Sequence, residues 1–100
     1  MENFGINEKS YNLLTDFFKQ HEEVQIVKVW GSRLDGTYHS SSDIDLIIKF
    51  THKTNIYILE KEINKLPIPY RIQITDIDYE KFDTLGIYIY NESPIFYEKN

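Results

Sequence analysis

Two short apolar segments with the composition of β-strands enclose a polar loop in the first half of the chain. The segments are Val24–Trp30 and Leu46–Phe50, and the loop between them opens with Gly-Ser and closes with Asp-Ile-Asp. Side chains alternate along a strand, so Asp43 and Asp45 project from the same face if the second strand begins there. The spacing therefore predicts a strand–loop–strand unit that brings a glycine turn and two carboxylates to one place.

Two carboxylates at this separation suit a divalent cation. Mg²⁺ typically takes one or two protein carboxylates, and water and substrate phosphates fill its remaining positions. Gly31 lets the backbone approach a ligand closely, and a helical turn opened by Ser32 and Arg33 would present N–H groups to phosphate. Each piece alone is more often an ordinary turn or a solvated strand end. Their joint occurrence between two strands favours nucleotide binding through phosphates and a metal.

The rest of the chain predicts one small domain of helices and strands. We expect helices from the N-cap Asn7 to about His21, from the N-cap Thr54 through Leu66 and from Asp78 to about Tyr90, strands at Val24–Trp30, Asp43–Phe50 and Arg71–Thr75, and an edge strand at Pro94–Tyr97. One hundred residues, 41% of them hydrophobic, are enough for a single core. We therefore expect a single domain over residues 1–100.

Charge and composition narrow the classes of partner and of site. The formal net charge of −5 argues against a nucleic-acid groove, because nonspecific affinity for nucleic acids comes mainly from Lys and Arg, so a protein acceptor fits better. The chain has no cysteine, which excludes a disulfide framework and a thiolate zinc site. No apolar run approaches the roughly 18 residues that span a membrane, and the N-terminus lacks the basic start of a signal peptide. We expect a cytoplasmic protein.

The loop and its flanks resemble the DNA polymerase β-like nucleotidyltransferase superfamily, and most closely its smallest members, the minimal nucleotidyltransferases. The similarity extends from about Tyr11 to the C-terminus and is carried by Gly31-Ser32-Arg33, Gly36, Ser42-Asp43-Ile44-Asp45-Leu46 and Ile68-Pro69-Tyr70-Arg71-Ile72. The resemblance implies an α/β (α+β) fold in which helices pack on a small mixed β-sheet. It also implies transfer of a nucleoside monophosphate from a triphosphate, with ATP as the first candidate, dependent on Mg²⁺ or Mn²⁺.

The resemblance further implies a protein partner. Small nucleotidyltransferases of this kind are frequently antitoxins that pair with a helical HEPN-type ribonuclease toxin and modify it with AMP, in a homo- or hetero-oligomeric assembly. Carried over residue by residue, Asp43 and Asp45 are the catalytic metal ligands, and Gly31, Ser32 and Arg33 contact the phosphates. Ser42 belongs to the same phosphate-binding loop and shapes its turn.

This chain departs from the family pattern at the third carboxylate, whose place falls on Gln73. A glutamine cannot accept a proton as a general base does, and its amide oxygen is a weaker metal ligand than a carboxylate. Asp76 lies on the opposite face of the strand unless a bulge at Thr75 changes the register. Three hypotheses stay open: an active transferase, a catalytically weak or silent nucleotide-binding antitoxin, and a subunit of a larger transferase.

Overall fold

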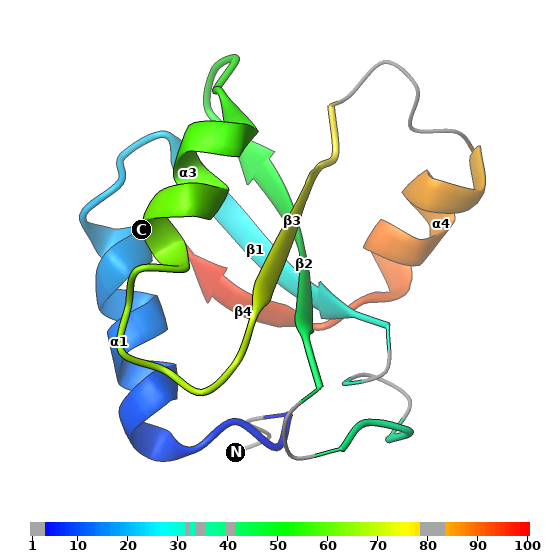
Figure 1. Ribbon diagram of the computed structural model, residues 1–100. Coiled ribbons are helices and arrows are strands. Elements are labelled where there is room, and N and C mark those ends of the chain that lie inside the picture. Colours follow the sequence, from blue (N-terminus) through cyan, green and yellow to red (C-terminus); the bar gives the residue numbers. More distant parts are fainter. Residues whose placement is uncertain (1–3, 32, 34–35, 40–41, 79–83) are drawn as a thin grey trace.

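In the computed structural model, the described part of the chain folds into a mixed sheet with helices on both faces (Figure 1). The structure describes residues 4–31, 33, 36–39, 42–78 and 84–100. The elements are α1 (Glu8–Lys19), β1 (Val24–Trp30), β2 (Ile44–Phe50), α3 (Ile56–Ile63), β3 (Ile72–Asp76), α4 (Thr84–Glu92) and β4 (Ile95–Glu98). No helix among these residues is both long and apolar enough to cross a membrane.

The strand order in the sheet is β3-β2-β1-β4. β1 pairs antiparallel with both β2 and β4, whereas β2 and β3 are parallel. Parallel neighbours need a crossover connection, and α3 provides it between β2 and β3. Helices α1 and α3 lie on one face of the sheet and α4 lies on the other (Figure 1). These observations confirm the expected fold of helices packed on a small mixed sheet.

The main core lies between the sheet and the helices α1 and α3. Side chains from both helices and from alternate positions of β1 and β2 are fully buried there; they are Leu14, Phe18, Leu59, Ile63, Val27, Val29, Leu46 and Ile48. Because strand residues alternate, Asp45, Ile47 and Lys49 of β2 face the other side. Ile47 is buried on that side, and Lys28, its neighbour on β1, bonds the Tyr90 carbonyl of α4 at 3.0 Å. The two faces of β2 therefore serve different purposes, core packing on one and polar groups on the other.

Most of the predicted elements are present, with small shifts at their ends. β1 has the predicted bounds, and the side chain of Asn7 caps α1 by accepting a hydrogen bond from Ser10 N at 2.8 Å. β2 and β3 each begin one residue later than predicted, and β4 occupies a sheet edge as expected. The last helix is described from Thr84, because residues 79–83 of its predicted span lie outside the described residues, and it extends to Glu92.

The prediction for the second helix was wrong at both ends. Its N-cap is Asn55 rather than Thr54, because the Asn55 carboxamide accepts hydrogen bonds from the backbone N–H groups of Tyr57 and Ile58. The helix ends at Ile63 instead of Leu66. Residue 64 is an asparagine whose side chain bonds to the neighbouring strand, as described next, and this tertiary contact stops the helix early.

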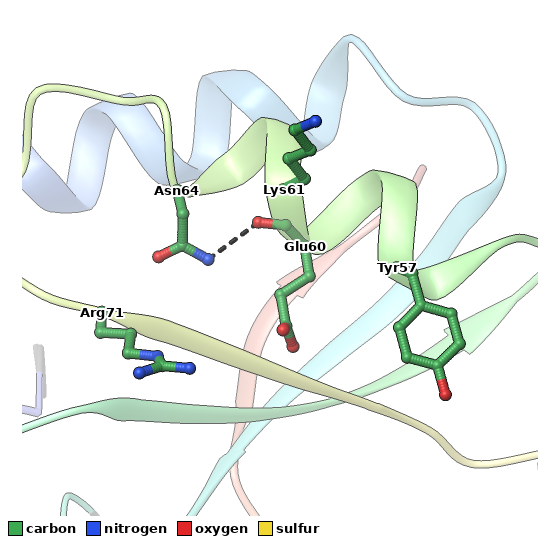
Figure 2. Close-up of a pocket in the computed structure, with 5 residues that line it drawn as sticks. All are labelled: Tyr57, Glu60, Lys61, Asn64 and Arg71. Carbon is green, nitrogen blue, oxygen red and sulfur yellow. Dashed lines mark hydrogen bonds between the residues drawn. The ribbon is translucent and has the colours of Figure 1, made fainter.

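Side chains of α3 and of its C-cap residue, Asn64, close the outer edge of β3. Asn64 accepts from Ile72 N at 2.9 Å and donates to Ile72 O at 3.0 Å, while Glu60 accepts from Ile74 N at 2.8 Å. Figure 2 shows both side chains extending from the helix toward the strand, in a shallow pocket that is also lined by Tyr57, Lys61 and Arg71. Unpaired strand edges invite pairing with other chains, so these contacts protect the edge.

Candidate functional site

The carboxylates of Asp43 and Asp45 come together at the start of β2, on the face opposite the main core. Asp45 is flanked in the sheet by Trp30 of β1 and by Gln73 of β3. Asp43 immediately precedes the strand, and its carboxylate reaches the Gln73 side chain. The two carboxylates thus lie at the start of β2, next to residues of β1 and β3 on either side.

Gln73, the residue on which the resemblance places the third carboxylate, lies next to both aspartates. Its Nε2 donates a hydrogen bond to Asp43 Oδ2 at 2.7 Å, and in the parallel register it lies directly beside Asp45. β3 pairs with β2 without a register shift from Ile72 to Asp76, so over these described residues there is no bulge at Thr75. Asp76 pairs with Ile48, three positions along the strand, or roughly 10 Å away at 3.3 Å per residue. The structure therefore does not bring Asp76 together with Asp43 and Asp45.

Gly31 allows the chain to turn directly beside Asp45. Its φ of +78° lies in the left-handed region that favours glycine. A Cβ on this residue would lie 2.7 Å from Asp45 Oδ2, which is closer than such atoms can approach. The positive φ therefore favours glycine here, and any larger residue would also displace the Asp45 carboxylate. The next residue, Ser32, was predicted to contact phosphate and lies outside the described residues.

Arg33 is buried, with 3% of its surface exposed, and its guanidinium bonds to backbone carbonyls from two segments. Nη2 donates to Ser42 O at 2.8 Å, and Nη1 donates to the carbonyls of Phe4 and Gly5 at 3.3 Å each. The cation also lies over two aromatic rings, 4.5 Å from the ring centre of Tyr38 and 4.9 Å from that of Tyr70. These contacts tie the N-terminal segment to the loop that leads into Asp43, so Arg33 has a structural task that spacing alone did not indicate.

Ser42 shapes the turn in front of the carboxylates. Its hydroxyl accepts a hydrogen bond from His39 N at 2.7 Å, and its own N–H donates to the His39 carbonyl at 3.0 Å. Together with the Arg33 contact to its carbonyl, these bonds engage Ser42 on both sides of the peptide. The hydroxyl, the N–H and the carbonyl of Ser42 are thus each held by a hydrogen bond. These bonds fix the backbone position from which the Asp43 side chain extends.

Asp45 experiences an unfavourable environment for its charge. Burial raises its pKa above the ordinary value of 3.8, and the neighbouring Asp43 carboxylate raises that pKa further. A divalent cation bound between the two carboxylates would offset both effects, and oxygen donors of this kind are those that Mg²⁺ and Mn²⁺ prefer. The absence of a Cβ at Gly31 keeps Asp45 Oδ2 unobstructed. The residues present therefore fit a divalent cation.

The two aromatic rings over the Arg33 guanidinium could not be predicted from residue spacing. Tyr70 also accepts a hydrogen bond from Asn7 N at 3.1 Å through its hydroxyl, so it joins the helix cap to the same cluster. Tyr70 belongs to the segment Ile68-Pro69-Tyr70-Arg71-Ile72, which carries part of the family resemblance. That resemblance did not indicate that Tyr70 contacts Arg33. Contacts between residues 37 positions apart leave no local signal in a single sequence.

Comparisons with known proteins address the family and the fold of the chain. The family model described as polymerase beta, nucleotidyltransferase, matches residues 12–100. A sequence search of curated proteins found no match. One similar crystal structure is that of a toxin–antitoxin with AMP-PNP, which aligns with a TM-score of 0.68 at 17% identity over 90% of this chain and 74% of that chain.

A second similar structure comes from Sulfolobus solfataricus and is of a protein assigned as a nucleotidyltransferase. It aligns with a TM-score of 0.56 at 16% identity over 90% of this chain and 78% of that chain. At these identities the two structures establish a shared fold. The match to the family covers most of the chain, including all the site residues named above. The chain belongs to the polymerase beta nucleotidyltransferase family.

Proposed function

We propose that this chain binds a nucleoside triphosphate together with Mg²⁺ or Mn²⁺ and transfers the nucleoside monophosphate to a protein, acting as the antitoxin of a toxin–antitoxin pair. The observation that carries the proposal is the convergence of Asp43 and Asp45 beside the positive-φ turn at Gly31, in a member of a nucleotidyltransferase family. Asp43 and Asp45 hold the cation. Gly31 and Ser32 contact the phosphates, and Arg33 and Ser42 hold the loop that carries these groups.

The proposed reaction is a displacement at the α-phosphorus. An acceptor hydroxyl oxygen forms a bond to that phosphorus, the bond to the oxygen bridging the α- and β-phosphates breaks, and pyrophosphate leaves. The bound cation neutralises charge on the phosphates. The hydroxyl proton passes to solvent, because Gln73 is neutral and cannot take it. General-base help is typically worth about 10²–10⁴-fold in rate, so we expect slow transfer.

We propose ATP as the nucleotide and a helical HEPN-type toxin as partner and acceptor. The similar toxin–antitoxin structure was determined with AMP-PNP, an adenine nucleotide, which supports ATP. The resemblance to minimal nucleotidyltransferases supports the toxin partner. A chain of 100 residues with net charge −5 also favours a protein acceptor over nucleic acid. The reaction would take place in the cytoplasm, where ATP and Mg²⁺ are supplied.

The test is a mass measurement on the partner. A helical HEPN-type protein is incubated as the candidate partner with the chain, ATP and Mg²⁺, and its intact mass is recorded. We expect increments of one AMP unit that disappear with EDTA and with Asp43→Asn or Asp45→Asn. Asp76→Asn, which changes an acid outside the site, serves as the matched control and keeps the transfer. An unmodified partner at all enzyme concentrations would refute the transferase.

A second candidate, an antitoxin that binds nucleotide without transfer, is favoured by the hydrogen bond from Gln73 to Asp43. It predicts that the chain still neutralises its partner after Asp43→Asn and Asp45→Asn. The substitution Gln73→Asp separates the two candidates further. If the missing acid limits the native chain, this variant gains transfer activity by a large factor, whereas robust native activity with no gain would show that Gln73 does not occupy the limiting position.

A further inference from the structure

The contact between Gln73 and Asp43 bears on how many cations the site can hold. Gln73 Nε2 lies 2.7 Å from Asp43 Oδ2, a short distance that is typical of a hydrogen bond to a charged acceptor. The amide is held in this orientation by charge, because a flipped carboxamide would bring its oxygen against a carboxylate oxygen. One oxygen of Asp43 thus already faces the positive end of an N–H dipole.

Sites that hold two divalent cations need more anionic oxygen than this site offers. The two ions of such sites lie roughly 3.5–4 Å apart, and carboxylates must offset their mutual repulsion. Among the described residues, no group of three or more His, Cys, Asp or Glu side chains could hold a metal ion. The strand position beside Asp45, from which a third carboxylate would complete the set, carries the neutral Gln73.

We infer that Gln73 restricts this site to a single divalent cation, the one that accompanies the triphosphate. It does so because a neutral amide stands where a third carboxylate would bind a second cation, and because this amide bonds to Asp43. This inference rests on the nucleotide binding proposed above, but not on the transfer. The amide supplies to Asp43 part of the positive potential that a second cation would otherwise supply. Nucleotide binding is then retained with one cation.

The experiment counts cations directly. Chain and AMP-PNP are mixed in equal amounts at concentrations well above their dissociation constant, Mn²⁺ is added stepwise, and free Mn²⁺ is measured by electron paramagnetic resonance. We expect about one bound Mn²⁺ per nucleotide site in the native chain and about two in Gln73→Asp. Gln73→Asn, which shortens the amide and adds no charge, is expected to keep one. Gln25→Asp, which adds a carboxylate at the opposite end of β1, is the matched control and also keeps one.

Each outcome of this count decides the inference. About two Mn²⁺ ions in the native chain, or one in both the native chain and folded Gln73→Asp, overturns it while leaving nucleotide binding intact. Two Mn²⁺ ions in Gln25→Asp would also overturn it, because a carboxylate far from the site would then be enough to add a second cation. A native chain that binds no AMP-PNP with or without Mn²⁺ refutes the proposed function itself, and the inference falls with it. Gln73 is exposed, so Gln73→Asp should fold, and Gln73→Glu gives a second acid of the native length.

Discussion

Replacing Arg33 with methionine tests whether the buried guanidinium holds the site loop in place. Methionine is of similar length and fills much of the same space, but it donates no hydrogen bond. The substitution would leave the carbonyls of Phe4, Gly5 and Ser42 without this donor. It would also remove the positive charge from between the rings of Tyr38 and Tyr70.

The expected loss of stability can be worked out from these contacts. Hydrogen bonds to a charged group contribute about 1.5–3 kcal/mol each. We count the 2.8 Å bond to Ser42 as one and the two 3.3 Å bonds from Nη1 together as another, which gives about 3–6 kcal/mol. Methionine recovers part of this by burying apolar surface, so we expect a net loss of about 3 kcal/mol. For a domain of this size that corresponds to a decrease in Tm of roughly 12–24 °C.

The assay is urea unfolding followed by tryptophan fluorescence, since Trp30 ends the strand that leads into this loop. Arg71→Met is the matched control, because Arg71 is exposed and loses the same charge, and such surface changes are usually within about 0.5 kcal/mol. A loss below about 1 kcal/mol for Arg33→Met, or equal losses for both variants, would show that the buried contacts of Arg33 do not hold the loop.

Three further predictions follow from single contacts. Gly31→Ala should lower the free energy of unfolding by about 1–2 kcal/mol because of the positive φ at this position, as measured by urea unfolding. It should also weaken nucleotide binding, measured by calorimetric titration, because the added Cβ meets the Asp45 carboxylate. Because the pKa of Asp45 is raised in the folded state, its contribution to stability is complete below about pH 3.8 and is lost as the pH rises through the folded-state pKa. Asp45→Asn should therefore stabilise the metal-free protein at pH 7 and not at pH 3, as measured by thermal melts. A variant that is less stable than the native protein at pH 7 would contradict this. Asn64→Ala removes both side-chain hydrogen bonds to Ile72 and should lower the free energy of unfolding by about 1–3 kcal/mol. It should also promote aggregation, which light scattering measures, because it exposes the edge of β3. Unchanged stability would show that these bonds are not needed to cover the edge.

Local sequence patterns predicted the parts of the fold that depend on neighbouring residues. The bounds of β1 follow from its apolar run, and the cap of α1 depends on Asn7 and Ser10, which are three positions apart. The shared face of Asp43 and Asp45 follows from strand alternation. These features could be predicted because the interactions that decide them act over a few residues.

The remaining features depend on contacts between distant residues. Arg33 bonds to a carbonyl 29 positions earlier, and Gln73 bonds to a carboxylate 30 positions earlier. The early end of α3 at Ile63 reflects the bond from Asn64 to a strand that comes later in the chain. The helix α4 is present as expected, but none of its described side chains is buried and Leu85 is 64% exposed. Tertiary packing decides such cases, and spacing alone does not encode it.

The features that oppose folding are concentrated at one end of the sheet. Asp45 carries a charge in a partly buried place, and Asp43 adds a second charge beside it. Other polar side chains among the described residues have partners, since Asn64 bonds to Ile72 of β3 and the Arg33 guanidinium donates to the Ser42 carbonyl. Proteins tend to retain such locally unfavourable arrangements where function requires them. A cation bound at the start of β2, as proposed above, would offset this unfavourable charge.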